Sequence, residues 1–124
     1  MKTIVSNIYK LSDIDFTVPQ IYNFINGTHK IASLERVTYD DLVRLYGEPS
    51  ILHYRDPDTD GKIQVEWVFE FLGNPYTIYD WKTFDRDYTL QELNRWSIGG
   101  RGKDIHFFET LRSEFSPKRI TINY

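Results

Sequence analysis

The sequence predicts an α+β fold, in which an antiparallel β-meander of three to five strands is covered on one face by about three to four short helices. Two observations predict this class. Polar and apolar residues alternate along residues 62–72, between two turn-rich segments, whereas residues 39–46 and 104–115 carry apolar residues at helical spacing. We expect residues 37–124 to be the main domain, and residues 1–36 to be an N-terminal extension that belongs to the same unit.

The N-terminal extension holds a predicted strand and a predicted short helix. β-Branched residues are frequent in residues 2–9, which favours a strand. Pro19 suits the first turn of a helix and Asn26-Gly27 suits a helix end, so we expect a helix between them. The pattern weakens over residues 28–36, and we expect the junction with the main domain there.

Three more helices are predicted in the main domain. Thr38 and Asp41 form a near relative of a capping box, which predicts the start of a helix that Gly47 ends. Thr89 and Glu92 form a second capping box, and periodicity predicts the third helix. The expected helices are residues 39–46, 90–95 and 104–115.

The predicted meander has its central strand in residues 62–72, between strands in residues 51–55 and 76–81. Alternation in the central strand places one set of side chains in the core and leaves the other face at least partly wet. A last strand, residues 119–124, is expected at a sheet edge. Uncovered edges and many aromatic residues lead us to expect a homo-oligomer. The core-facing set of the central strand is Ile63, Val65, Trp67, Phe69 and Phe71.

Composition argues against several functional classes. The net charge of −3 and the isoelectric point near 5.6 disfavour binding to duplex DNA, which requires a broad basic face. The chain has no cysteine, so disulfides and thiolate chemistry are excluded, and a reducing cytosol is the compatible compartment. No apolar run reaches about 18 residues, so we expect no transmembrane helix.

We predict neither a metal site nor a cofactor. The three histidines, His29, His53 and His106, have no recognisable ligand spacing. The segment Asp56-Pro57-Asp58-Thr59-Asp60-Gly61 matches the opening of a calcium loop of the EF-hand kind, but the twelfth position is Trp67 instead of a carboxylate. Turn formation is therefore the favoured interpretation of this acidic segment, and cation binding there is left open.

The predicted ligand site is the segment Trp96-Ser97-Ile98-Gly99-Gly100-Arg101-Gly102-Lys103, which leads into the last helix. Its spacing matches neither the P-loop nor the dinucleotide fingerprint. Glycine N–H groups, the start of a helix and two cations nevertheless suit an anion, and the preceding indole could stack on a ring. The alternative is a flexible connection from strand to helix with solvated cations. The predicted ligand-binding residues are Trp96, Gly99, Gly100, Arg101, Gly102 and Lys103.

A second candidate surface is aromatic and suits a protein partner. Large amphipathic rings are typical of interface hot spots. The alternative is that these rings are core residues or cross-strand pairs of the meander. The candidate protein interface consists of Trp67, Tyr76, Tyr79, Trp81 and Tyr88.

Three blocks of residues occur in a characteristic order: Leu45-Tyr46-Gly47-Glu48-Pro49, then Glu66-Trp67 with Ile78-Tyr79-Asp80-Trp81-Lys82, and then Trp96-Ser97-Ile98-Gly99-Gly100. In this order they resemble a recurrent group of small uncharacterised proteins of tailed bacteriophages. The similarity covers about residues 37–111. It implies a phage accessory protein, and such proteins often counter host defence. The resemblance brings no catalytic assignment with it.

The residues and the resemblance together lead to two functional hypotheses. In the first, the chain is a non-enzymatic anti-defence protein in the host bacterial cytoplasm. It binds a phosphate-bearing small molecule, such as a cyclic-nucleotide immune signal, at the glycine loop. In the second, it is a protein inhibitor that binds and occludes a host defence enzyme or nuclease. No feature of the sequence points to a hydrolase.

Overall fold

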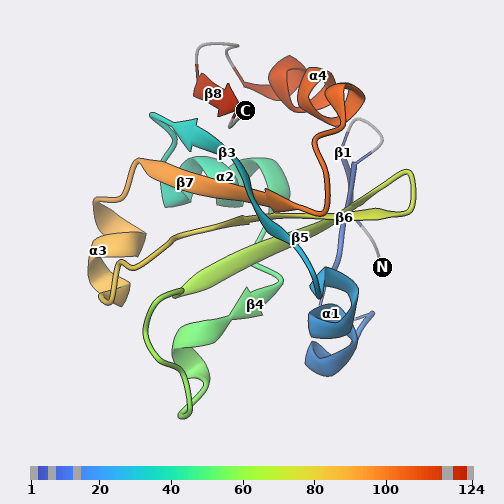
Figure 1. Ribbon diagram of the computed structural model, residues 1–124. Coiled ribbons are helices and arrows are strands. Elements are labelled where there is room, and N and C mark those ends of the chain that lie inside the picture. Colours follow the sequence, from blue (N-terminus) through green and yellow to red (C-terminus); the bar gives the residue numbers. More distant parts are fainter. Residues whose placement is uncertain (1–2, 6–7, 13–14, 116–118, 123–124) are drawn as a thin grey trace.

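The computed structural model describes residues 3–5, 8–12, 15–115 and 119–122, and Figure 1 shows how the elements are arranged. The fold is α+β, as the sequence predicts. In chain order, the elements of the described part are β1 (Thr3–Val5), β2 (Ile8–Lys10), α1 (Val18–Ile25), β3 (His29–Glu35), α2 (Tyr39–Tyr46), β4 (Ile51–Leu52), the 3₁₀ helix η1 (His53–Arg55), β5 (Val65–Phe71), β6 (Asn74–Tyr79), α3 (Arg86–Gln91), β7 (Arg95–Gly100), α4 (Ile105–Glu114) and β8 (Ile120–Ile122).

The described strands form one antiparallel sheet of eight strands, more than the three to five predicted. The order across the sheet is β1-β2-β5-β6-β7-β3-β8, and β4 pairs with the first residues of β5. The order of the predicted meander is confirmed, because β4, β5 and β6 follow one another both in the chain and in the sheet. Two details of it are wrong: residues 53–55 of the first predicted strand form η1, and Ile63 precedes β5 and lines a pocket instead of the core. The sheet is larger than predicted because β7 and β3 continue it beyond β6.

Residues 28–36 do not form the expected junction, because residues 29–35 form the interior strand β3. This strand pairs with β7 on one side and with β8 on the other. Ile31, Ala32, Ser33 and Leu34 are all buried, so the strand lacks the alternation that marks a half-exposed strand. The weak local pattern therefore reflects burial on both faces.

Helices cover both faces of the sheet, and the predicted one-face arrangement is wrong (Figure 1). Leu42 of α2 and Phe107 of α4 belong to the same core cluster as Trp67 of β5. On the other face, Ile21 of α1 clusters with Val68 of β5. Because Trp67 and Val68 are consecutive in a strand, their side chains point to opposite faces. We call these two sides the α2/α4 face and the α1 face.

Helix α2 begins and ends where its capping residues predict. The hydroxyl of Thr38 accepts a hydrogen bond from the N–H of Asp41 at 3.2 Å, and the Asp41 carboxylate accepts one from the N–H of Thr38 at 3.0 Å. Gly47 follows the helix with φ of 81°, a conformation that glycine adopts without strain. The local sequence therefore determines both ends of this helix.

Helix α3 begins earlier than the predicted range of residues 90–95. Asp85 caps this helix by accepting hydrogen bonds from the N–H groups of Asp87 and Tyr88. Thr89, the predicted capping residue, lies inside the helix and donates its hydroxyl to the buried carboxylate of Asp80 at 2.9 Å. The predicted capping box of Thr89 and Glu92 therefore does not form, because the Thr89 hydroxyl is hydrogen-bonded to Asp80.

The predicted terminal strands lie at the two ends of the sheet order. A single strand was expected over residues 2–9, but the described residues form the hairpin of β1 and β2. Strand β8 lies beside β3 at the opposite edge, as expected for residues 119–124. Residues 2, 6–7 and 123–124 of these two predictions fall outside the described residues. Within the described part, every helix is too short or too polar to cross a membrane.

Candidate functional site

The predicted glycine loop begins as a strand. Trp96, Gly99 and Gly100 lie in β7, which pairs with β6 and β3. The Trp96 side chain is 1% exposed, and its indole N–H donates to the carbonyl oxygen of Val37 at 2.8 Å. The expectation that this indole stacks on a ligand is wrong, because the ring belongs to the core and packs edge-on against Trp67. Gly99 and Gly100 are likewise sheet residues and do not form a loop.

Gly100 is required for packing. A Cβ atom at this position would lie 2.9 Å from Cδ1 of Ile31 and 2.9 Å from Cδ1 of Tyr76. The Tyr76 ring in turn stacks on Phe107 of α4, with 3.7 Å between the ring centroids. The absent side chain at Gly100 therefore lets the sheet and α4 approach closely.

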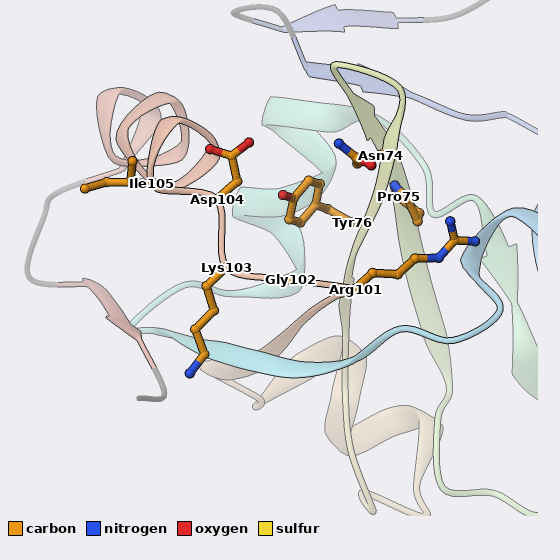
Figure 2. A pocket seen from close by; sticks show the side chains of 8 residues that line it. All are labelled: Asn74, Pro75, Tyr76, Arg101, Gly102, Lys103, Asp104 and Ile105. Carbon is orange, nitrogen blue, oxygen red and sulfur yellow. The ribbon is translucent and has the colours of Figure 1, made fainter.

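The connection from β7 to α4 lines a pocket of about 570 Å³ (Figure 2). Arg101 donates from Nε to the carbonyl of Asn26 at 3.1 Å and from Nη2 to the carbonyl of Phe24 at 3.0 Å. It therefore binds carbonyl groups at the C-terminal end of α1. Figure 2 shows that the side chains of Arg101 and Lys103 point in different directions. The two cations do not converge on one anion.

The start of α4 already carries a negative charge. The Asp104 carboxylate accepts a hydrogen bond from the N–H of His106 at 2.8 Å and so caps the helix. Burial and this carboxylate together raise the pKa of Tyr76, which lines the same pocket, to about 12. An anionic ligand would approach Asp104 here, which is unfavourable. Phosphate binding by Arg101, Gly102 and Lys103 stays a prediction, and this geometry does not favour it.

The residues of the predicted protein interface divide into two groups. Trp67 and Tyr76 are core residues, with exposed fractions of 0% and 3%, and their assignment to a surface is wrong. Trp81 and Tyr88 are 50% and 44% exposed, and Tyr79 is partly exposed. Only these three residues of the predicted interface are accessible to a partner.

A row of polar residues crosses the α1 face. The register of β5 and β6 pairs Glu66 with Tyr79, that of β6 and β7 pairs Tyr79 with Ser97, and that of β7 and β3 pairs Ser97 with Ser33. Directly opposed residues of neighbouring strands share a face and lie close together. Four strands therefore bring these polar side chains into one line.

A second pocket, of about 550 Å³, lies at one end of this row. We call it the α1-face pocket. Its volume is within the range of ordinary small-molecule sites. Helices α1 and η1 and strands β3, β5 and β6 contribute to its lining, which consists of Tyr22, Ile25, Thr28, His29, Lys30, His53, Ile63, Glu66, Tyr79 and Trp81.

Three of these residues form a chain of hydrogen bonds. His53 Nε2 lies 2.8 Å from Oε1 of Glu66, and His53 Nδ1 lies 3.1 Å from the hydroxyl of Tyr22. An ionised carboxylate only accepts hydrogen bonds, so Nε2 carries a proton toward Glu66. The Tyr22 hydroxyl donates to Nδ1 in the neutral ring and accepts from Nδ1 in the doubly protonated ring. The side chains of His53 and Glu66 are 13% and 8% exposed. Both nitrogens of this imidazole are therefore engaged.

The two tyrosines of the pocket are neutral at neutral pH. Burial and the Glu66 carboxylate raise the pKa of Tyr79, and a hydrogen bond with Ser97 offsets part of this increase. Burial, Glu66 and Asp56 raise the pKa of Tyr22. Both residues therefore present hydroxyl groups that can donate and accept hydrogen bonds.

The rim of the pocket combines a cation with an accessible indole. Lys30 is exposed, and it has no ion-pair partner among the described residues. Trp81 is half-exposed and packs at right angles to Tyr79, with 6.3 Å between their ring centroids. Lys30 and Trp81 also border a neighbouring groove of about 310 Å³ that Tyr88 and Ser97 line. The accessible surface therefore continues beyond the pocket.

No family model, no curated protein and no solved structure matches this chain. We therefore infer a function from the residues of the α1-face pocket. Sequence reasoning named two of them, Tyr79 and Trp81, but missed Glu66, His53 and Lys30. A usable signal was present, because Glu66 and Tyr79 occupy polar positions of strands that were correctly predicted to be neighbours.

The acidic turn between η1 and β5 uses its carboxylates locally. Asp56 accepts a hydrogen bond from the N–H of Asp58 at 2.9 Å, and Asp60 accepts one from the N–H of Lys62 at 3.0 Å. These are Asx turns, in which a carboxylate takes the place of a backbone carbonyl. The geometry is that of a turn, the interpretation that the sequence favours.

Proposed function

We propose that this protein is a non-enzymatic accessory protein of a tailed phage, which binds a phosphate-bearing small molecule in the host bacterial cytoplasm. A cyclic-nucleotide immune signal is one such ligand, and its capture would serve an anti-defence role. The proposed site is the α1-face pocket, in place of the glycine loop. The observation that carries the proposal is the exposed Lys30 beside the half-exposed ring of Trp81, at the rim of a pocket of about 550 Å³.

The pocket has the two components that a nucleotide requires. The Trp81 indole offers a flat surface for a base, and base stacking on an aromatic side chain contributes about 1–3 kcal/mol. Lys30 and the adjacent His29 line the same pocket and can meet a phosphate. A ligand with both a ring and a phosphate would use both components at once.

The hydrogen bonds of His53 favour binding over catalysis. A general base needs a free nitrogen within reach of the proton that it removes. Nε2 of His53 faces Glu66 and Nδ1 faces Tyr22, so neither nitrogen is free to activate a water molecule. We therefore propose that the His53–Glu66 pair shapes the pocket and does not transform the ligand.

Thermal unfolding with a panel of nucleotides tests this proposal. A ligand at 100-fold excess over its Kd stabilises the folded state by roughly 2.7 kcal/mol, which raises the melting temperature measurably. Intrinsic fluorescence then locates the site, because Trp67 and Trp96 are 0% and 1% exposed while Trp81 is 50% exposed. Ligand stacking should quench the emission of Trp81, and the variant Trp81→Phe should lose this quenching. The absence of stabilisation by every nucleotide and anion would refute the proposal.

A second candidate function is inhibition of a host defence enzyme or nuclease through a protein interface. Three large rings favour it: Trp81, Phe84 and Tyr88 are 50%, 60% and 44% exposed within eight residues of chain. Phe84 also has a φ of 55°, a left-handed conformation that is strained for a bulky residue. Strain of this kind is concentrated at functional sites.

Affinity capture from host lysate tests the second candidate. An inhibitor should recover one host protein in stoichiometric amount, and Phe84→Ser should abolish the capture. Phe84 does not line the α1-face pocket, so the same variant should leave nucleotide binding unchanged. Capture that survives Phe84→Ser would contradict the interface.

A further inference from the structure

We infer that the α1-face pocket recognises a base whose edge carries adjacent N–H donors, as guanine does, and that Glu66 is the group that reads this edge. The inference rests on the proposed function, because it names the ligand class of the same pocket. It starts from the hydrogen-bond capacity of one buried carboxylate.

Glu66 is 6% exposed and has one engaged oxygen. Its Oε1 accepts from His53 at 2.8 Å, whereas no hydrogen bond to Oε2 is formed within the described residues. Oε2 is not among the fully buried side-chain oxygens without a partner, so it keeps contact with water on the pocket side. Glu66 lines the pocket, so a ligand that donates hydrogen bonds there would engage this second oxygen.

The neighbours of Glu66 fix its orientation. The hydrogen bonds that link Tyr22 to His53 and His53 to Glu66 fix the position of Oε1. The backbone of β5 is paired with β4 and with β6 at Glu66. Oε1 keeps a second lone pair, so both oxygens can accept from two parallel N–H groups. The N1–H and exocyclic amine of guanine present two such donors side by side. Adenine and uracil do not offer this pair.

The remaining groups of the pocket match the other parts of such a ligand. Tyr79 is directly opposite Glu66 in the register of β5 and β6 and lines the same pocket, and its hydroxyl can donate to a carbonyl next to the N–H edge. Lys30 lies on β3, three strands from β5, which corresponds to about 14 Å between the two backbones. A ligand that reaches both Glu66 and Lys30 must therefore have a base at one end and a charged group at the other.

Calorimetric titration of the full chain with four nucleotides tests the inference. The probes are the 5′-monophosphates of guanosine, inosine, adenosine and uridine. Guanosine monophosphate should bind most tightly. Inosine monophosphate lacks only the exocyclic amine and should bind about tenfold more weakly, the effect of one lost hydrogen bond to a charged group. This comparison uses the unaltered protein, so it does not depend on how any variant folds.

A matched pair of variants assigns the effect to Glu66. Glu66→Gln should weaken the binding of guanosine monophosphate by about tenfold or more, and it should remove the preference over inosine monophosphate. Glu70→Gln is the control, because Glu70 lies on the same strand and the same face but outside the α1-face pocket. This control should leave both affinities unchanged.

The results of these titrations separate failure of the guanine inference from failure of the proposed function. Tight binding of all four nucleotides without base preference, or an unchanged preference in Glu66→Gln, would overturn the inference and leave the proposed function standing. Binding of none of the four would overturn this inference, and the wider panel of nucleotides and anions then decides the proposed function separately.

Discussion

Asp80 is the residue on which the end of the meander depends. Its carboxylate is fully buried and accepts hydrogen bonds from the N–H groups of Gln64 and Val65, at 2.9 and 3.0 Å, and from the hydroxyls of Thr83 and Thr89. An amide in its place would turn an NH₂ group toward some of these donors. We expect Asp80→Asn to lower the free energy of unfolding by about 3 kcal/mol.

Urea denaturation of Asp80→Asn measures this loss. The control is Asp58→Asn, an exposed substitution in the acidic turn, which should change the free energy of unfolding by less than about 0.5 kcal/mol. Equal stability of the two variants would show that the buried Asp80 carboxylate does not stabilise the end of the meander.

Two glycines of the predicted ligand loop differ in their surroundings. A Cβ at Gly100 would lie 2.9 Å from Ile31 and Tyr76, whereas a Cβ at Gly102 would meet nothing within 4 Å. We expect Gly100→Ala to destabilise the protein by about 1–3 kcal/mol, because overpacking displaces these side chains. Gly102→Ala should be neutral or slightly stabilising. Thermal melting of both variants checks this, and equal melting temperatures would contradict the packing role.

Single residues of the site were predictable only where their exposure follows from local sequence. Trp81 is the last residue of the predicted strand of residues 76–81, and its half-exposed indole agrees with the prediction that it is accessible to a partner. Trp96 precedes two glycines, and the sequence alone does not reveal that its indole N–H donates to Val37, 59 residues away. Glu66 was assigned to a partly wet face, but its role depends on His53 and on β6, whose positions the fold supplies.

At the scale of elements, Arg101 links the end of β7 to the end of α1. Its two hydrogen bonds reach the carbonyls of Phe24 and Asn26. We expect Arg101→Ala to lower the free energy of unfolding by about 1 kcal/mol, since the side chain is exposed and the carbonyls can turn to water. Arg101→Lys should lose about as much, because an ammonium group keeps the charge but not the two-pronged geometry.

Chemical denaturation distinguishes this structural role from a purely electrostatic one. If Arg101→Lys retained full stability, charge alone would be sufficient at this position and the two hydrogen bonds would be dispensable.

Elements whose ends are defined by neighbouring residues were predicted well. Helix α2 matches its predicted range because Thr38 and Asp41 cap it and Gly47 ends it. Strand β3 was missed because both of its faces are buried, which removes the alternation, and because its pairing partners β7 and β8 lie far away in the chain. The predicted range of helix α3 was displaced because Thr89 donates a hydrogen bond to Asp80 and does not cap the helix. Long-range partners are the common cause of these errors.

The whole molecule should unfold in alkali because buried tyrosines resist ionisation. Burial and Glu114 raise the pKa of Tyr46, which is 1% exposed, and the pKa values of Tyr39 and Tyr76 rise to about 12. In the unfolded chain these groups ionise near pH 10. Stability is therefore complete below about pH 10 and decreases above it, by about 1.4 kcal/mol per pH unit for each tyrosine that stays protonated in the folded state.

Melting temperatures between pH 8 and pH 11 measure this dependence. The variant Tyr46→Phe cannot ionise at this position, so its stability should decrease less steeply above about pH 10 than that of the unaltered protein. A stability that is constant across this range would contradict the account of the buried tyrosines.

The two faces of the sheet differ in what covers them. The α2/α4 face is closed by two helices over a large aromatic core. The α1 face has a smaller cluster around Ile21 and Val68, with the polar row and the α1-face pocket beside it. This difference supports the proposal that a ligand binds on the α1 face. The sequence predicted that one face of β5 is more exposed to solvent. It did not predict that a helix would cover part of this face and leave a pocket beside it.

The most direct test of the account compares two lysines that lie in different pockets. Lys30 lines the α1-face pocket and Lys103 lines the pocket at the predicted glycine loop. With the tightest nucleotide of the panel, calorimetric titration of Lys30→Ala should show a Kd increased by about tenfold or more, and Lys103→Ala should bind like the unaltered protein. Loss of binding in Lys103→Ala with full binding in Lys30→Ala would contradict the account and return the ligand site to the glycine loop.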